Sequence, residues 1–419
     1  MFRQRLAFLR DPFTWWAGFL ILLIVIGLAC AALVFTQGLH VTNLTDLVPW
    51  GLWIGIDLSA IALAAGAFTI SALVYLLKIK KLLPVAKTAV YLGLLGYTMA
   101  VCTLLLDIGR PDRFWHAMAY WNIHSPLWEV TMCVTLYLSV LALEVVPIVG
   151  SSDMVRGRWP GIGKYMVSIH KLAPILAVAG LCLSLLHQTS LGITYGVLRG
   201  RYAWNRPTVA LLFIVSAVAA GPALVVFASQ VASRLTARAK IKPELLNSVA
   251  KYIGWVLIGY FFLRVWDLLF LSYSVGEIGG ETWQYLIQGP LALNFWVGEM
   301  AIGIIIPLVI LLVPRWRKNP RLQIPAMAMV VIGLILYRWD TNMLGQMVVY
   351  SYLPHETTAL FTNYLPSLVE IGAGLGVVAY GLLAFTIGVR YFRIIDHDEA
   401  HEEHVLKLVS VPMMVSGEQ

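Results

Sequence analysis

Four protonatable side chains interrupt four successive apolar stretches of the chain, namely Asp57, Asp107, Glu129 and His187. A charge at the centre of a bilayer costs roughly 3 kcal/mol on insertion scales, so such residues usually mark a function. An imidazole and carboxylates between apolar and aromatic walls can hydrogen-bond two carbonyl oxygens and exchange two protons. This chemistry suits a quinone, with the electrons supplied by another protein.

Other cofactor chemistry lacks the residues it needs. Haem b held by two histidines requires a pair of them inside the bundle, but His187 is the only histidine well inside an apolar stretch. The four cysteines are scattered singly, and no P-loop or HExxH motif occurs. We therefore expect no haem, no iron-sulfur cluster and no metal site in this chain.

A second set of ionisable residues lies in the later apolar stretches. Its members, which form a predicted polar network, are Arg264, Asp267, Glu299, Arg338 and Asp340, with Glu370 further on. Arg264 and Asp267 are three residues apart on one helix face and are expected to pair. Arg338 is expected to neutralise Glu299 or Asp267 from a neighbouring helix. A structural ion-pair network is the favoured interpretation of this set, whereas a functional role is favoured for the first set.

The composition places these residues in a membrane protein. Hydrophobic residues make up 59% of the 419 residues and charged residues only 12%, and the mean hydropathy is +0.79. Soluble domains carry about 25% charged residues, so a soluble enzyme, a disordered chain and a coiled coil are excluded. About 20 apolar residues span a bilayer as a helix. Ten such runs occur: 15–36, 50–77, 84–107, 127–149, 166–188, 208–232, 249–271, 291–313, 324–344 and 366–390.

The positive charges predict the orientation of these ten helices. Of the 30 Lys and Arg residues, 23 lie in the two tails and in the connections after even-numbered helices, and five lie in the opposite connections. Basic residues accumulate on the cytoplasmic side. Both termini are therefore expected in the cytoplasm, and the net charge of +8 reflects topology rather than nucleic-acid binding.

The first set of residues then falls in the outer half of the membrane, and the inner half is nearly empty. Glu144 is the exception, either as one step of a proton route or as an interfacial carboxylate. The outer connections contain Trp115, Trp121, Trp204 and Trp283, which suits an interfacial aromatic belt or a docking surface. The tail from Asp396 carries three histidines and is expected to be solvated.

Four short motifs in residues 49–200 resemble the NrfD/PsrC family of quinone-reactive membrane subunits. They are Pro49-Trp50-Gly51-Leu52-Trp53-Ile54 with Asp57, Leu106-Asp107-Ile108-Gly109-Arg110-Pro111, Asn122-Ile123-His124-Ser125 with Glu129, and His187-Gln188-Thr189-Ser190-Leu191-Gly192. The chain looks closest to the branch that contains the membrane subunits of hydrogenase-2 (HybB) and of menaquinone reductase (QrcD). The match weakens after these motifs.

The resemblance implies an all-α polytopic membrane protein with two four-helix bundles, made of helices 2–5 and 6–9 and flanked by helices 1 and 10. The expected divisions are 1–36 for the cytoplasmic N-terminus and helix 1, and 49–200 for the first bundle with the quinone site. The second bundle follows at 205–345, helix 10 at 366–395 and a cytoplasmic tail at 396–419. The implied location is the bacterial or archaeal cytoplasmic membrane.

The resemblance also implies roles for single residues. His187 and Asp57 would lie nearest the quinone, with menaquinone as the expected type, and Gln188, Trp50, Trp53 and His124 would be further binding residues. Glu129, Asp107 and Glu144 would transfer protons, and Arg110 would dock the partner or line the site. For the two tryptophans, the alternative is helix packing or the aromatic belt.

The predicted function is that of a membrane subunit in a respiratory oxidoreductase complex that binds quinone near the outer face. The resemblance implies an extracytoplasmic, ferredoxin-like iron-sulfur subunit as the electron partner, with catalytic or cytochrome subunits beyond it. Menaquinone reduction is the favoured direction, and quinol oxidation stays open because the resemblance implies neither. Two alternatives remain: a transporter-like subunit that moves ions or protons, and a passive membrane anchor.

Overall fold

The computed structural model describes residues 11–75, 77–236, 241–273, 277–353, 356–392 and 394–395. The arginines of the N-terminal tail and the histidines of the 396–419 tail lie outside these ranges. Ten helices in the described part are long and apolar enough to cross a membrane. The prediction of an all-α polytopic membrane protein with ten spanning helices is confirmed.

The ten spans begin and end close to the predicted apolar runs. In chain order they are α2 (Pro12–Gln37), α3 (Leu52–Tyr75), α4 (Leu83–Asp107), α6 (Pro126–Gly150), α9 (Ala173–Gly196), α10 (Thr208–Leu235), α11 (Pro243–Tyr273), the π-helix η5 (Asn294–Ile305) continued by α13 (Ile306–Leu312), α15 (Pro320–Met347) and α16 (Leu368–Ile387), which runs into η6 (Gly388–Phe392). Proline occupies the first turn of several, where its missing N–H is tolerated.

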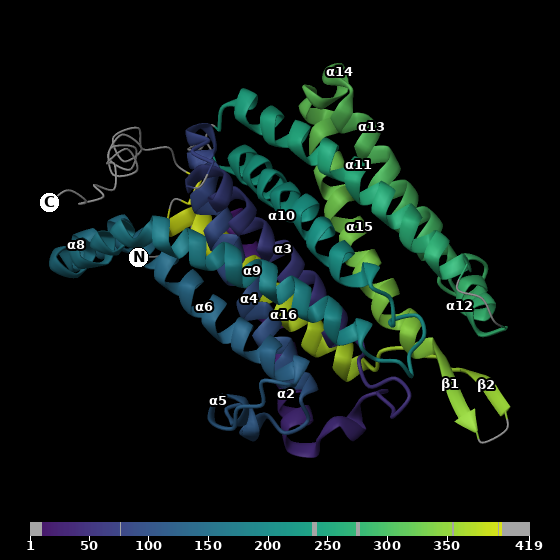
Figure 1. Ribbon diagram of the computed structural model, residues 1–419. Helices are drawn as coiled ribbons and strands as arrows, with labels where there is room; N and C mark the ends of the chain where they lie inside the picture. The colour runs from purple at the N-terminus through teal and green to yellow at the C-terminus, as the bar shows by residue number, and fades with distance from the viewer. Residues whose placement is uncertain are drawn as a thin grey trace, which may run out of the picture.

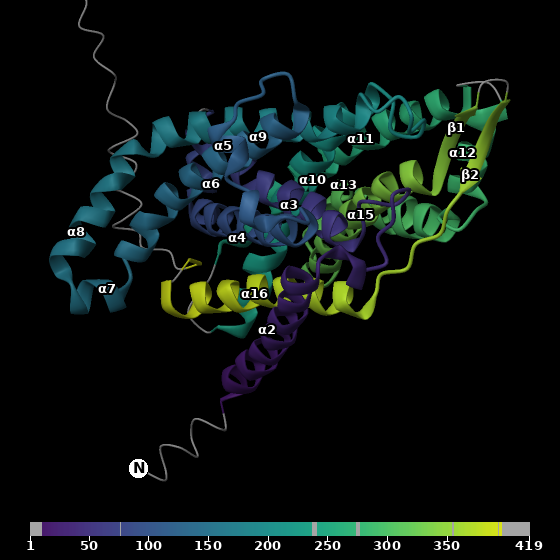
Figure 2. The same cartoon turned by 90° about the horizontal axis from the view of Figure 1, so that it is seen from below.

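Contacts between neighbouring helices define two groups. In the first helix group, α3 contacts α4 and α9, and α6 contacts the same two helices. In the second helix group, α10 contacts α11 and α15, and η5–α13 packs against α15 while α13 also contacts α11. Helices α3 and α10 join the two groups near the centre of the molecule (Figure 1). The first and last spans, α2 and α16, pack on each other at one side of the first group (Figure 2).

Small residues allow neighbouring helices to approach closely. A Cβ atom added at Gly66 of α3 would collide with the backbone of Gly221 on α10, so only glycine fits at this crossing of the two groups. At the crossing of α2 and α16, a Cβ atom on Gly27 would lie 2.6 Å from the Cα atom of Gly376. Glycines in apolar spans thus serve close helix packing, as is usual in membranes.

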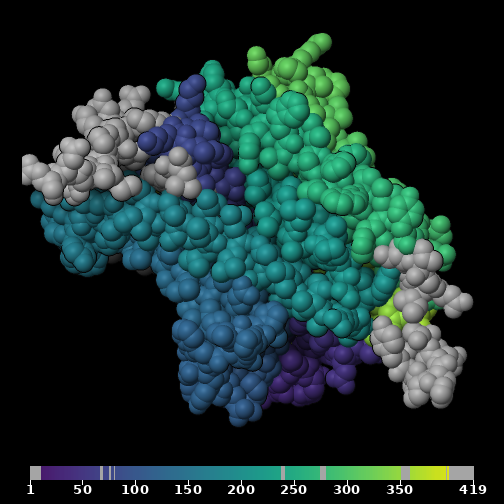
Figure 3. Space-filling view, in the orientation of Figure 1, coloured from purple at the N-terminus to yellow at the C-terminus, as the bar shows by residue number. Residues whose placement is uncertain are grey.

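The connections gather at two ends of the helices (Figure 1). The hairpin end carries η1 (Leu39–Val41), η3 (Pro111–Arg113), α5 (His116–Ala119), α12 (Glu277–Ile287) and the hairpin of β1 (Val348–Leu353) and β2 (Glu356–Phe361). The elbow end carries η2 (Lys80–Leu82), α7 (Asp153–Arg158), α8 (Pro160–Ser168), η4 (Ile169–Leu172) and α14 (Pro314–Arg317). In the space-filling view, the blue residues around α5 and α6 project from the body at the hairpin end (Figure 3).

The β-hairpin is a departure from the purely helical expectation. Its strands pair antiparallel, with Val348 opposite Phe361. The sequence Val-Val-Tyr-Ser-Tyr-Leu is rich in the β-branched and aromatic residues that favour strands. The hydropathy pattern identifies spanning helices and carries no signal for a short strand pair in a connection.

Candidate functional site

A buried histidine–tyrosine pair lies at the centre of the first helix group. His187 of α9 is 0% exposed, and its Nδ1 atom is 2.6 Å from the hydroxyl of Tyr97 on α4. Nε2 of the same ring has no hydrogen-bond partner among the described residues. When the tyrosine hydroxyl donates to Nδ1, the neutral ring carries its proton on Nε2. The histidine then offers one free donor inside the first group.

Two carboxylates accompany this pair at the hairpin-end side. Asp57 of α3 is 2% exposed, and its Oδ1 atom finds no hydrogen-bond partner within the described ranges. Asp107 closes α4, and its Oδ1 atom is likewise buried without a described partner. Buried carboxylates without partners are costly, so this cluster is an exception that calls for a function.

Two further predicted residues have clear partners. Glu129, in the first turn of α6, accepts a hydrogen bond of 2.7 Å from the hydroxyl of Ser190 on α9. Gln188 follows His187 on α9 but points to the second helix group, where its Oε1 atom accepts from Arg338 at 3.2 Å. Consecutive residues on a helix point about 100° apart. Helix α9 therefore presents His187 to one group and Gln188 to the other.

A second tyrosine packs against the histidine–tyrosine pair. The rings of Tyr97 and Tyr137 are 4.2 Å apart between centroids and meet edge to face. Tyr137 lies on α6, seven residues before Glu144, and therefore on the same helix face two turns away. Oε2 of Glu144 is buried and has no partner among the described atoms. Glu144 therefore lies on the elbow-end side of the tyrosine that packs against the histidine pair.

The two predicted tryptophans have different surroundings. Trp53 is buried, and its indole N–H donates to the carbonyl oxygen of Glu370 at 3.0 Å, on the side of α3 that packs against α2 and α16. Trp50 stacks on Trp204 with ring centroids 5.3 Å apart and also touches Tyr195. Trp53 thus has the packing role considered as its alternative, whereas Trp50 borders the junction of the two groups.

Two predicted residues lie on the exposed connection between α4 and α6. His124 is exposed, and its backbone N–H donates to the side chain of Asn122. Arg110 donates two hydrogen bonds of 3.0 Å to Asp112, which hold the pKa of that carboxyl below its ordinary value. Neither residue contacts the His187 pair in this structure, which favours partner docking over site lining for Arg110.

The second helix group contains a connected ion-pair network. Arg264 of α11 pairs with Asp267 one turn away at 2.6 Å, as predicted, and donates two hydrogen bonds of 2.6 and 3.0 Å to Glu299 of η5. Arg206 pairs with Asp267 at 2.7 Å, and Thr208 also donates to this carboxylate. Two positive and two negative charges are therefore balanced inside the group.

The predicted partner of Arg338 was wrong. Its guanidinium reaches neither Glu299 nor Asp267, both of which are held by other arginines. Instead, its Nη2 atom donates to Gln188, to the carbonyl of Phe213 and to Ser216. Asp340 is two residues further along the helix and on another face, where Asn294 donates to it at 2.5 Å. Sequence spacing gave the residues of the network but not their pairing.

Three site residues could not be predicted from the sequence. Tyr97 is an uncharged residue in an apolar run, and only the fold shows that it faces His187. Ser190 is common on helices, and only the ring of first-group helices brings it to Glu129. Arg206 looked like an ordinary connection arginine, although its position just before a proline and a helix start offered a weak sign of ordered structure. Within the described ranges, no group of three histidine, cysteine or acidic residues is placed to hold a metal ion.

Comparison with known proteins supports the family resemblance over most of the chain. The family model described as "Polysulphide reductase, NrfD" matches residues 40–350. The integral membrane subunit of menaquinone reductase from Nitratidesulfovibrio vulgaris is 32% identical over 394 residues, covering 92% of both chains.

Two more distant relatives come from other complexes. The integral membrane subunit of an Hdr-like menaquinol oxidoreductase from Archaeoglobus fulgidus is 24% identical, over 94% of this chain and 96% of its own. The probable Ni/Fe-hydrogenase 2 b-type cytochrome subunit of Escherichia coli is 24% identical, over 87% of each. The region that matches the family model contains both helix groups and the His187 cluster.

Proposed function

Because this chain belongs to the polysulphide reductase NrfD family, we propose that it is the membrane subunit of a respiratory oxidoreductase complex and that its first helix group binds menaquinone. The observation that carries this proposal is the buried His187–Tyr97 pair with its free Nε2 atom, set beside the unpartnered carboxylate of Asp57. A relative that is 32% identical is named as a menaquinone reductase subunit, which supports menaquinone as the acceptor.

The unpartnered polar atoms fit the groups of a quinone. When bound, a quinone accepts two electrons and two protons. The Nε2–H of His187 is placed to donate a hydrogen bond to a carbonyl oxygen, and Tyr97 fixes the orientation of the ring from its other nitrogen. Asp57, in its protonated form, is a second donor. Both Trp50 and Trp53 were expected near the quinone ring. We retain only Trp50 in the proposed site, because Trp53 packs on the side of α3 that faces α2 and α16.

Two proton routes lead to this site. Asp107 and Glu129 lie toward the hairpin end, which we assign to the outer, periplasmic side on the basis of the positive charges in the opposite connections. Glu144 lies toward the elbow end, beyond Tyr137. With both termini in the cytoplasm, the first route takes protons from outside and the second takes them from inside. The second route would move charge across the membrane.

Electrons would enter at the hairpin end. We assign the partner there to an extracytoplasmic iron-sulfur subunit, since the aromatic connection around α5 and the pair Arg110–Asp112 are exposed at this end. The relatives are named as integral membrane subunits of a menaquinone reductase and of a menaquinol oxidoreductase, so a catalytic subunit would follow the iron-sulfur subunit. The chain itself would carry neither haem nor cluster, although the name of one relative includes "b-type cytochrome".

The test uses the complex extracted mildly from its native membrane. The quinol analogue 2-heptyl-4-hydroxyquinoline N-oxide is added, and the iron-sulfur signal is followed by electron paramagnetic resonance. We expect a shift that disappears in the His187→Ala variant and persists in His170→Ala, a matched change at the elbow end. An iron-sulfur signal that the analogue leaves unchanged in the wild type would overturn the quinone assignment. Flux through proteoliposomes without any redox donor would instead favour the transporter alternative.

A further inference from the structure

Arg338 is a buried cation without a buried anion. It is 0% exposed on α15, and no salt bridge to it occurs among the described residues, whereas Arg206 and Arg264 both have carboxylate partners. Its Nε and Nη1 atoms have no hydrogen-bond partner in the described part of the chain. A buried charge without a counter-charge is expensive to maintain. Such a residue is retained where its charge or its donors serve a function.

The neighbours of Arg338 stabilise it without neutralising it. Its guanidinium lies 3.5 Å from the centroid of the Phe213 ring and 5.6 Å from that of Tyr337, and aromatic faces attract cations. Nη2 donates hydrogen bonds to three uncharged acceptors: the Phe213 carbonyl at 2.9 Å, and the side chains of Ser216 and Gln188 at 3.2 Å each. The positive charge therefore persists and acts on its surroundings through a medium of low dielectric constant.

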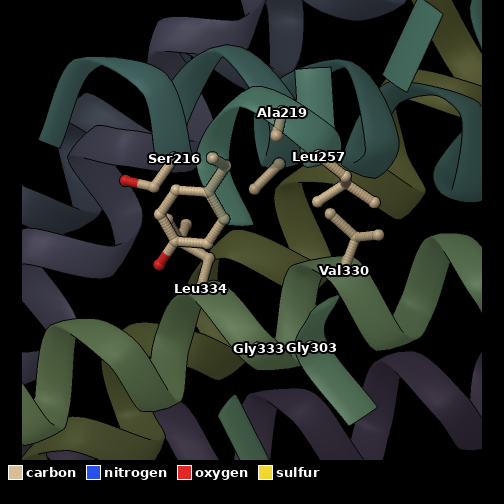
Figure 4. A pocket seen from close by; sticks show the side chains of 9 residues that line it. Ser216, Ala219, Leu257, Gly303, Val330, Gly333 and Leu334 are labelled. Carbon is tan, nitrogen blue, oxygen red and sulfur yellow. The ribbon is translucent and has the colours of Figure 1, made fainter. Parts of the chain in front are cut away.

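A small cavity lies beside Ser216, one of the three acceptors of Arg338 (Figure 4). Ser216 and Tyr260 supply hydroxyl groups to its wall, and the rest of the lining is apolar or glycine. The Tyr260 hydroxyl has no hydrogen-bond partner among the described atoms. The space suits about one water molecule, which needs two or more polar partners. No charged side chain is among the described residues that line this cavity, so it supplies no counter-charge for Arg338.

Gln188 links Arg338 to the first helix group by a hydrogen bond. This side chain is 2% exposed, and its neighbour on α9 is the histidine of the quinone site. The Tyr337 ring is near both arginines: its centroid is 5.6 Å from the guanidinium of Arg338 and 5.1 Å from that of Arg264. A continuous set of contacts therefore runs from the balanced ion pairs of the second group, through Arg338, to the turn of α9 that carries His187.

We propose that Arg338 is a positioning residue of the quinone site: from the second helix group it fixes the Gln188 side chain and the adjoining turn of α9, and its uncompensated charge favours the arrival of electrons beside His187. This proposal rests on the proposed function. It gives the second helix group, whose carboxylates Asp267 and Glu299 are held in ion pairs, a defined part in the reaction.

The test compares variants of Arg338 in the intact complex. Reduced benzyl viologen supplies electrons and 2,3-dimethyl-1,4-naphthoquinone accepts them. In the Arg338→Gln variant we expect kcat to fall about tenfold, within the range of coupling through contact networks, while KM changes by less than about twofold. Arg338→Lys retains the charge, so its kcat is expected to recover to within about threefold of wild type. Equal losses in Gln and Lys variants would show that the charge has no role and overturn the proposal.

The matched control is Arg317→Gln. Arg317 is also buried, and its described hydrogen bonds go to uncharged groups, namely Asn247 and two backbone carbonyls near the elbow end. Its removal creates a comparable packing defect far from Gln188, so kcat should stay within about twofold of wild type. A tenfold fall in the kcat of Arg317→Gln would show that loss of any buried arginine lowers the rate through general destabilisation, and would overturn the proposal.

A binding measurement separates this proposal from the proposed function. Quenching of 2-heptyl-4-hydroxyquinoline N-oxide fluorescence reports occupancy without turnover. No quenching in the wild-type complex would refute the quinone site itself. Quenching in the wild type with unchanged kcat in Arg338→Gln would refute the role of Arg338 alone. If Arg338→Gln does not assemble, the double variant Gln188→Met with Arg338→Lys replaces it, and an effect equal to the sum of the single changes would contradict the coupling.

Discussion

The two helix groups bury similar kinds of side chain but treat their charges in opposite ways. In the second group, Arg264, Asp267 and Glu299 are paired at 2.6 to 3.0 Å, and their charges balance together with Arg206. In the first group, carboxylate and imidazole atoms are buried and have no described partner. Paired charges are stable and chemically inert, whereas unpaired groups remain able to bind and exchange protons. Arg338 is the exception in the second group; otherwise the difference distinguishes ion pairs that stabilise the fold from the groups that the proposed function uses for reaction.

The largest effect is expected from breaking the paired group. Arg264→Leu leaves two buried carboxylates with one arginine, and loss of one partner of a buried pair costs about 3–5 kcal/mol. We expect a large fall in the thermal unfolding temperature, measured by intrinsic fluorescence, while quinone reduction per assembled complex changes little. Arg234→Gln, at an exposed position near the end of α10, is the control. If Arg264→Leu kept normal stability but lost quinone reduction, the ion pairs of the second group would serve the reaction and not the stability of the fold.

The next largest effect is expected in the reactive group. His187→Ala removes the donor for the quinone carbonyl, and loss of a positioned acid–base group lowers rates by roughly 100-fold or more. Quinone reduction should fall accordingly, while co-purification of the partner subunits and the unfolding temperature remain close to wild type. A strong loss of stability with normal turnover would assign the histidine to packing.

A smaller effect is expected at the residue that orients the histidine. Tyr97→Phe keeps the ring packed against Tyr137 but removes the hydrogen bond to Nδ1. Turnover is expected to fall about tenfold, because the imidazole loses its fixed tautomer and orientation. Steady-state kinetics with a soluble naphthoquinone measures the change. Tyr252→Phe, on α11 in the second group, should leave turnover unchanged; an equal fall there would argue against a specific role for Tyr97.

The inner proton route is tested by Glu144→Gln. If Glu144 delivers protons from the cytoplasmic side, charge movement in proteoliposomes should decrease, and turnover should fall severalfold, because the amide cannot exchange a proton. A potential-sensitive dye monitors the charge movement. Unchanged turnover and unchanged charge movement would show that the protons enter from the hairpin end.

The smallest effect is expected at the surface. Arg110→Gln removes the two hydrogen bonds that do most to keep the pKa of Asp112 low, so this pKa should rise toward its ordinary value, with Arg113 still nearby. A carboxylate with a lowered pKa adds stability above its unfolded-state pKa and loses it as the pH falls. Because the pair is exposed and screened, the unfolding temperature at pH 7 should stay the same, whereas affinity for the iron-sulfur partner should decrease. Unchanged partner affinity would remove Arg110 from the docking surface.

The ten spanning helices and the ionisable members of the candidate site could be identified from the sequence. Asp57, Asp107, Glu129 and His187 could be found because ionisable residues in apolar runs are rare and expensive. Tyr97 could not, since a tyrosine in an apolar run has no such cost. Trp53 shared a motif with Asp57, but hydropathy does not reveal which face of α3 packs against α16.

The sequence alone determined the ten spanning helices, because the bilayer requires each span to bury about 20 apolar residues and to satisfy its own backbone hydrogen bonds. It also identified the charged residues that lie within the apolar spans. The tertiary structure alone decided the partners of those charges. Pairing depends on distances of a few ångströms between helices far apart in the chain, such as the 3.2 Å from Arg338 to Gln188 across 150 residues. Such distances are set by helix packing, down to the glycine contact between α3 and α10, and no local pattern encodes them.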